Sequence, residues 1–448
     1  MKILLVILFV IVWVGCSTDT VSNATPMITK TGDKEFNYAY TFLYYYYYLA
    51  EDELKSSDYY LTNPDMVIDK EEYADYADVY CMFREMSDLM TQYFPPDLFQ
   101  KVNQAITTSP VNTKSFGMEL DENLRVKYVY RFGPAATAEM KRGDQILAVD
   151  STFFSTDSTD FTEQYQSVLQ KKTTDDFDFT ILRGKDTLKI SMTREDVISP
   201  TVYVDSIDNI PIIRVTEFTP ITNGFQNDGS AEEFEAALKE TDGAKSTVLD
   251  LRGNPGGSTE LCTRMAMDLL PAGDTAFIQL EWKPKGTERS IQASYFVNDK
   301  DGLGSGRYYV LLLDGNSASC AEIFATAITS NLKAPIVGET SFGKGIGQVY
   351  SKTPEKGYAV ATSMLLFDKD SVSYHMFGLE PDFTIKNADS ALTTAVKIAK
   401  ERKEKRTAGY SERVNSYWLR VKRKAPESVE ERLRDWTRGL AIQEVSVE

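Results

Sequence analysis

Between about residues 200 and 399, short runs of consecutive apolar residues alternate with helix-like segments, which restricts the possible folds more than any other feature. The runs are Ile210–Val215, Thr247–Leu251, Tyr308–Leu313 and Pro335–Val337. Strands that are apolar on both sides occur in sheets covered on both faces. The sequence therefore predicts an α/β domain over residues 199–400, with helices after Ser258 and after Ser319.

Residues 108–198 have a different pattern, dominated by shorter β-like runs. These runs are Leu124–Tyr130, Gln145–Val149, Phe177–Leu182 and Thr187–Met192. A short helix-like stretch begins at Pro134 and leads through a Gly-Asp turn into the second run. We therefore expect a separate β-rich domain at residues 108–198.

Residues 36–107 are helical in pattern and rich in aromatic side chains, including the tract Tyr44–Tyr48. A further helical stretch, Tyr80–Phe94, stops at two prolines. Because consecutive tyrosines cannot all face one core, two interpretations stay open. The segment is an amphipathic helical domain with rings at its margins, or it is a platform for a peptide or partner.

The first residues have the pattern of a signal peptide, residues 1–16. A lysine is followed by the apolar run Ile3–Val14, then by Gly15 and Cys16, after which polar residues begin. As a helix this run spans about 18 Å, short of a hydrocarbon core of ~30 Å, so a permanent membrane span is the weaker alternative. Residues 17–35 are then a polar linker.

A formal charge of −17 argues against a nucleic-acid partner, because phosphate binding depends on clustered Lys and Arg. The charged residues 401–448 predict a solvated helical tail, with contact to an acidic partner or lipid headgroups as the alternative. Cys81, Cys262 and Cys320 are odd in number and scattered, so we expect no disulfide framework. A C-x-x-C or Cys/His cluster is also missing, so we expect no metal site, and we expect no cofactor.

Ser319 and Lys344 look like a nucleophile and its base. The chain holds one histidine, His375, placed in a predicted hairpin, so an imidazole base is nearly excluded. Ser319 falls between an apolar strand and a helix, where free N–H groups favour negative charge, although a simple N-cap is the alternative. Lys344 lies among uncharged neighbours, and burial can lower its pKa enough for it to act as a base. Otherwise it is a surface lysine on a glycine loop.

The glycine-rich stretch Asp250–Gly257 follows a predicted buried strand. Successive glycines let the backbone approach a substrate and turn N–H groups towards it, which favours an oxyanion hole. A phosphate loop is the rival, but the lysine and Ser/Thr of that motif are missing. Cys320, beside Ser319, is a competing thiol or, as a simpler reading, a small buried hydrophobe.

From about Ser115 to Lys400 the chain resembles the carboxyl-terminal processing, or tail-specific, serine proteases. The resemblance is carried by Asp250–Gly257, Ser319–Glu322, Phe342–Gln348 and Gly378–Asp382. It implies Ser319 as nucleophile, Lys344 as base with Gln348 as its partner, and the N–H groups of Gly257 and Cys320 as oxyanion donors. It also implies a crotonase/ClpP-like α/β core that cleaves unfolded or C-terminally exposed polypeptides.

The β-rich domain resembles a bacterial, circularly permuted PDZ domain, and Ser115, Phe116, Gly117 and Met118 resemble its carboxylate-binding loop. There an extended peptide would add a strand, although a domain used only for packing is the alternative. The N-terminal segment resembles a bacterial lipoprotein signal with Cys16 as the lipidated residue, which implies a chain exported to the bacterial cell envelope and anchored in its membrane. A catalytically silent peptide-binding scaffold is the rival function, and a homo-oligomer stays open.

Overall fold

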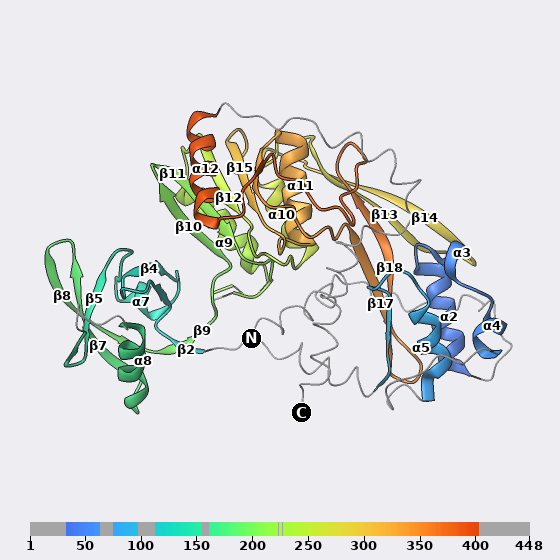
Figure 1. Cartoon of the computed structure of the whole chain (residues 1–448), viewed down its shortest axis with the longest axis horizontal. Helices are drawn as coiled ribbons and strands as arrows, with labels where there is room; N and C mark the ends of the chain where they lie inside the picture. The colour runs from blue at the N-terminus through green and yellow to red at the C-terminus, as the bar shows by residue number, and fades with distance from the viewer. Residues whose placement is uncertain are drawn as a thin grey trace. The chain divides into compact units, whose positions relative to one another are not determined.

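The computed structural model describes residues 33–62, 75–96, 113–154, 161–222, 224–225 and 227–402. The predicted signal peptide with Cys16, most of the predicted linker and nearly all of the predicted tail lie outside these residues. The chain divides into two compact units, described separately below: residues 108–203 with 219–237, and the remaining residues (Figure 1). No helix in the described ranges is long and apolar enough to cross a membrane.

The larger unit contains a six-stranded sheet, as the apolar runs predict. Its order is β10–β11–β12–β15–β16–β19, and the pairs from β11 to β19 are parallel. The strands are β10 (Val202–Ile207), β11 (Ile210–Val215), β12 (Ser246–Asp250), β15 (Tyr308–Leu313), β16 (Ile336–Gly338) and β19 (Phe383–Thr384). Residues of β12 are buried on both sides of the strand, which explains its unbroken apolar sequence.

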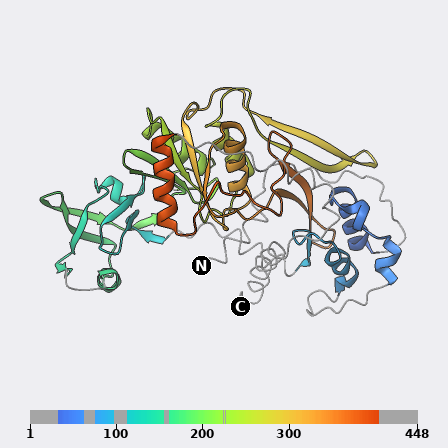
Figure 2. The ribbon, with the colours of Figure 1, turned by 45° about the horizontal axis from the view of Figure 1, so that its top comes forward.

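Three helices accompany this sheet: α10 (Thr259–Met267), α11 (Cys320–Leu332) and α12 (Ala388–Glu401), whereas most of α9 (Gly229–Glu240) belongs to the smaller unit. The apolar side of α12, with Ala395 and Ala399, packs on Val248, Val310 and other residues of one sheet face (Figure 2). Helices α10 and α11 pack against each other, and α11 also contacts β13 and β15. The helices after Ser258 and Ser319 are therefore confirmed.

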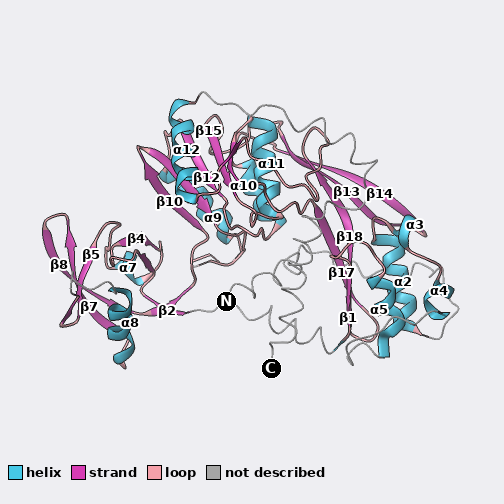
Figure 3. Cartoon of the chain, in the orientation of Figure 1, coloured by secondary structure: helices cyan, strands magenta, loops and turns pink. Residues whose placement is uncertain are grey.

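A second sheet of the larger unit has the order β1–β18–β13–β14, and β17 pairs with the other edge of β18 (Figure 3). The strands are β1 (Gln92–Phe94), β13 (Thr275–Lys285), β14 (Glu288–Val297), β17 (Ile346–Lys352) and β18 (Tyr358–Phe367). Neighbouring strands in this sheet are antiparallel.

The N-terminal helices lie on this second sheet. They are α2 (Lys34–Tyr46), α3 (Ala50–Glu53), α4 (Ser57–Thr62) and α5 (Ala77–Arg84). Their aromatic core, including Phe36 and Tyr47, packs on Ala359 and Ala361 of β18. The predicted helix to Phe94 is wrong beyond Arg84, because turns and the short strand β1 follow, and β1 pairs with β18.

The smaller unit is rich in β-strands. They are β2 (Thr113–Ser115), β3 (Met118–Leu120), β4 (Val126–Val129), β5 (Gln145–Val149), β6 (Thr152–Phe153), β7 (Asp176–Arg183), β8 (Asp186–Thr193) and β9 (Glu195–Val197). The helices α7 (Pro134–Thr137) and α8 (Phe161–Lys171) belong to it. Phe116, Phe177 and Phe179 meet edge to face in its core.

Candidate active site

Ser319 lies in the sharp turn between β15 and α11, at the N-cap position of the helix. Its backbone has φ 55° and ψ −116°, a conformation that a residue with a side chain rarely adopts. Strained backbone of this kind occurs where tertiary contacts hold a functional side chain in place. Ser319 is half-buried, whereas the following helix residues are almost completely buried.

One buried carboxylate, that of Glu322, joins the Ser319 turn to the Lys344 loop. Its Oε2 accepts hydrogen bonds from the backbone N–H groups of Ser319 at 2.9 Å and of Lys344 at 2.8 Å. Its Oε1 accepts from the hydroxyl of Ser341 and the N–H of Gly343, both at 2.6 Å. Because both backbone nitrogens donate to the same oxygen atom, they lie close to each other. The structure therefore brings the backbones of Ser319 and Lys344 together.

A second contact joins these loops. The Ser317 carbonyl accepts from the Phe342 N–H at 2.9 Å, and the Ser317 hydroxyl donates to the Leu251 carbonyl at 3.0 Å.

Lys344 is 4% exposed. Burial lowers the pKa of its amine to about 8, and the nearby carboxylates of Asp88 and Glu322 oppose that shift. Burial also raises the pKa of the Glu322 carboxyl to about 7, against its four hydrogen bonds. Since one pKa unit is a tenfold change in the protonation equilibrium, roughly one Lys344 amine in ten is neutral at pH 7.

His375 is buried beside Lys344, and its Nδ1 lies 3.3 Å from the carbonyl oxygen of Gly343. Burial lowers the pKa of its imidazole to about 4, so the ring is neutral at neutral pH. The predicted hairpin around His375 is wrong, because these residues form turns rather than strands. The ring supports the loop that carries Lys344.

Gln348 belongs to β17, which begins just after Lys344, and it lies opposite Thr362 of β18. Its side-chain amide donates from Nε2 to the Thr362 hydroxyl at 3.1 Å. A side-chain amide that donates through nitrogen has its oxygen left as an acceptor. Gln348 thus follows Lys344 closely in sequence, and its side-chain oxygen is an acceptor.

Gly257 and Cys320 stand at the N-terminal ends of α10 and α11. Phe218 donates to the Gly256 carbonyl and accepts from the Ser258 N–H, so the Gly257 N–H between them points away from Phe218. Gly257 has φ 138°, and a Cβ there would collide with the Phe218 carbonyl, so only glycine fits. Loop 250–257 is tied to the serine turn by the Ala318 N–H, which donates to the Asn254 carbonyl at 2.9 Å.

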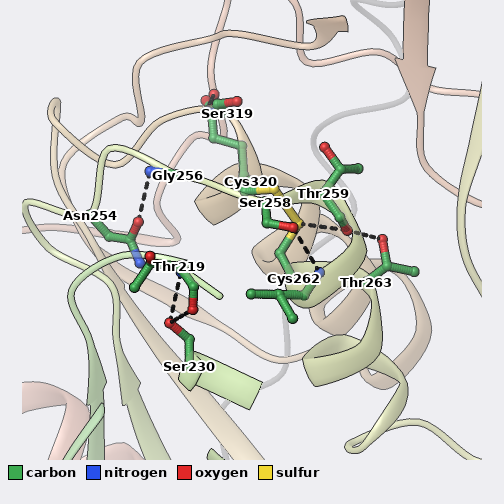
Figure 4. Close-up of a disulfide and its surroundings, with 12 residues drawn as sticks. Thr219, Ser230, Asn254, Gly256, Ser258, Thr259, Cys262, Thr263, Ser319 and Cys320 are labelled. Atoms are coloured by element: carbon green, nitrogen blue, oxygen red, sulfur yellow. Dashed lines mark hydrogen bonds between the residues drawn. A yellow bond between two sulfur atoms is a disulfide. The ribbon is translucent and has the colours of Figure 1, made fainter. Parts of the chain in front are cut away.

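A disulfide joins Cys262 of α10 to Cys320 of α11 (Figure 4). The expectation of no disulfide is therefore wrong. The two residues are 58 positions apart, and packing of the two helices brings their Cα atoms to 5.8 Å. Cys320 is fully buried, as expected, but its sulfur is bonded, whereas Cys81 is a buried free thiol.

The predicted peptide loop Ser115–Met118 lies in the smaller unit between β2 and β3. The Phe116 side chain is buried in the core. Gly117 has φ 69°, and its N–H donates to the Ser115 hydroxyl at 3.1 Å. Among the described strands, β3 pairs only with β4.

Sequence reasoning missed three contributors to the site. Glu322 could have been found, because Ser-x-x-Glu at a helix start is the capping-box pattern. Cys262 and Asp88 carry no local signal, since each meets its partner only through packing of distant segments.

Residues 209–385 match the model of peptidase family S41. A probable CtpA-like serine protease of Staphylococcus aureus (strain N315) is 29% identical over 305 residues, which are 68% of this chain and 58% of that protein. The corresponding protein of Staphylococcus haemolyticus is 26% identical over 306 residues, with the same coverage. The chain thus spans less than two thirds of the length of these curated relatives.

Two solved structures are also similar. The photosystem II D1 C-terminal processing protease has a TM-score of 0.48 and 19% identity, covering 81% of this chain and 96% of that one. A putative S41 protease from Bacteroides fragilis has a TM-score of 0.43 and 15% identity, covering 86% of this chain and 96% of that one.

Proposed function

We propose that the chain is a serine endopeptidase of the tail-specific, CtpA-like kind with a Ser319/Lys344 dyad, on the basis of its match to peptidase family S41 and its similarity to CtpA-like proteases. Its substrates are unfolded or C-terminally exposed polypeptides. The observation that carries the proposal is the shared Glu322 carboxylate, which holds the backbone of both dyad residues while burial makes the lysine a usable base.

In the proposed reaction, neutral Lys344 takes the proton of the Ser319 hydroxyl as its oxygen attacks the peptide carbonyl carbon. The negative charge that develops on the carbonyl oxygen is stabilised by the N–H groups of Gly257 and Cys320. The Lys344 ammonium then protonates the departing amine, and the C–N bond breaks to leave an acyl ester on Ser319. Water, deprotonated by the same lysine, cleaves the ester and restores the serine.

Gln348 holds the lysine amine during these proton transfers. An amide oxygen accepts a hydrogen bond without adding a negative charge, so it orients the amine and leaves its pKa low. A carboxylate in the same place would favour the protonated, inactive amine.

The dyad is tested with an unfolded protein substrate and purified enzyme. We expect Ser319→Ala and Lys344→Ala to abolish cleavage, by a factor of at least about 10³. Ser206→Ala and Lys239→Ala change an exposed serine and an exposed lysine away from the site and serve as matched controls. Cleavage by Ser319→Ala at the wild-type rate would refute Ser319 as the nucleophile, and peptide binding without cleavage by the wild type would favour the peptide-binding scaffold.

The smaller unit is, in this proposal, a PDZ-like domain at residues 108–198 that offers substrate tails to a crotonase/ClpP-like core at residues 199–400. Three features support this: the left-handed Gly117 in the loop Ser115–Met118, an edge of β3 that pairs with no described strand, and the helix α8 in the same unit. A peptide that pairs with β3 would direct its carboxylate to the loop. The helical residues 36–107 are proposed as a third part.

We also propose that the chain is exported and anchored to a bacterial cell envelope through lipid on Cys16. The Cys262–Cys320 disulfide supports export, because disulfides persist in oxidising compartments. The intact mass of the mature chain tests the anchor. A mass that still includes residues 1–15 would contradict it.

A further inference from the structure

The edge of β18 that faces away from β17 is covered by two different strands. β1 pairs with Tyr358–Val360, and β13 pairs with Met364–Phe367. Thr362 lies in the gap between them, and the N-terminal part of the chain closes that gap. The Tyr48 N–H donates to the Thr362 carbonyl at 2.9 Å, and the Thr362 N–H donates to the Thr91 hydroxyl at 3.0 Å.

These contacts fix the side chain of Thr362 against Gln348. Because the backbone groups of Thr362 face the N-terminal segment, Thr362 and Gln348 form a non-hydrogen-bonded pair, in which opposing side chains approach most closely. The Thr362 hydroxyl accepts from Gln348 Nε2. The Asp88 carboxylate interacts with Thr362, and geometry links the two residues through Thr91, whose hydroxyl accepts from the Thr362 N–H and donates to Asp88.

Asp88 belongs to the turn between α5 and β1. Its two oxygens accept from the Met90 N–H at 3.1 Å and from the Thr91 hydroxyl at 2.8 Å. Met90 anchors the turn in an apolar cluster with Ile346 and Leu365, which flank the Lys344 site on β17 and β18. The turn is therefore held on the sheet by packing as well as by polar contacts.

The charged and titratable groups around the Lys344 amine come from three parts of the chain. Asp88 and Glu322 interact with it electrostatically, and His375 is neutral. Tyr47, which lies near Asp88, is also neutral, because burial raises the pKa of its hydroxyl. In the described part of the chain, Asp88 and Glu322 are thus two carboxylates that act on the amine, and Asp88 also interacts with Thr362, the partner of Gln348.

Building on the proposed function, we propose that Asp88 is a positioning residue of the base site. In this proposal the Asp88 carboxylate accepts a hydrogen bond from the Thr362 hydroxyl, so that the Thr362 oxygen accepts from Gln348. The charge of Asp88 also acts on the Lys344 amine. A hydroxyl has one proton to donate, so an acceptor at Asp88 sets the direction of the whole chain of hydrogen bonds. The amide oxygen of Gln348 is then directed to the amine. The N-terminal region completes the catalytic centre.

Two substitutions separate the two roles of Asp88. In Asp88→Asn the charge is lost, but the amide oxygen still accepts from Thr362. We therefore expect the rising limb of the kcat/KM profile to shift to lower pH by roughly one unit or more. The plateau value of kcat/KM should stay within a few-fold of the wild type. In Thr362→Val the relay is lost and the charge stays. The plateau kcat then falls roughly 10- to 100-fold, with KM and the position of the limb unchanged.

Asp78→Asn is the matched control, because Asp78 is a half-buried aspartate of the same region that accepts from the N–H of Val79 and does not contact the base site. It should leave both quantities at their wild-type values. A wild-type limb in Asp88→Asn, or a wild-type plateau in Thr362→Val, overturns the proposal.

A readout that needs no turnover separates this proposal from the peptidase assignment. Lysine labelled with ¹³C at Cε reports the protonation of Lys344 by NMR, with its resonance identified by its absence in Lys344→Arg. A lower titration midpoint in Asp88→Asn supports the placement of Asp88 even if no peptide is cleaved. An unchanged midpoint in an enzyme that cleaves peptides refutes the role of Asp88 alone.

Discussion

At the scale of single residues, two titrations near neutral pH decide whether the site works. Burial brings the pKa of Lys344 down to about 8 and that of Glu322 up to about 7. Lys344 has to be neutral to accept the serine proton. Glu322 has to be ionised to accept four hydrogen bonds, because a protonated carboxyl directs a hydrogen at one of its donors.

The pH dependence of the proposed reaction follows from the lowered pKa of Lys344 and the raised pKa of Glu322. A base whose pKa is about 8 is increasingly neutral as pH rises, so we expect kcat/KM to increase up to tenfold per unit below pH 8 and to level off above it. The loss of ionised Glu322 below pH 7 steepens the acid side. Steady-state kinetics from pH 6 to 9 check this, and a flat profile across that range would contradict a buried lysine base.

At the scale of elements, helices α10 and α11 carry the two proposed oxyanion donors at their N-terminal ends. The Cys262–Cys320 disulfide ties these ends together. Free N–H groups at helix starts favour an anion, and the covalent link keeps the two starts at a constant separation. The spacing of the oxyanion donors thus depends on helix packing and on a covalent bond between the helices.

Removing this bond has a predicted cost in stability. A disulfide that closes a loop of 58 residues stabilises the folded state by roughly 2–4 kcal/mol, mainly by restricting the unfolded chain. We expect the double variant Cys262→Ser, Cys320→Ser to melt at a lower temperature than the wild type. Thermal unfolding with and without dithiothreitol measures it.

The double variant also provides the control for the reductant. Dithiothreitol should lower the melting temperature of the wild type and leave that of the double variant unchanged. Cys81→Ser removes the remaining buried thiol and should still respond to reductant as the wild type does. Equal sensitivity of wild type and double variant would show that the bond is not formed.

At the scale of the whole molecule, the proposed catalytic residues and the proposed substrate-binding loop belong to different compact units. The dyad, the oxyanion donors and the Asp88 turn belong to the larger unit, and the loop Ser115–Met118 belongs to the smaller one. A change that affects only recognition of the substrate tail should therefore change KM, whereas a change in the base site should change kcat.

A pair of substrates tests this division without altering the protein. We expect a peptide with a free C-terminal carboxylate to bind the Ser319→Ala variant at least about tenfold more tightly than the same peptide as an amide, since the loop N–H groups lose their anionic partner. Fluorescence anisotropy measures the affinities. A photo-crosslinker at the peptide terminus should label residues 115–118, and equal affinities or labelling elsewhere would contradict tail capture by this loop.

Residue order alone was enough for the α/β class, for strand bounds such as those of β11 and β15, and for the proximity of Ser319 to a helix start. These features depend on local periodicity and on turn residues, which neighbours in sequence determine. The contacts of Asp88, Thr362 and Cys262 depend instead on which surfaces pack together. Thr91 and Thr362 are 271 residues apart, and no local pattern encodes such a pair. The proposed reacting groups can thus be identified from local sequence patterns, whereas the lowered pKa of Lys344 and the spacing of the proposed oxyanion donors depend on tertiary burial and packing.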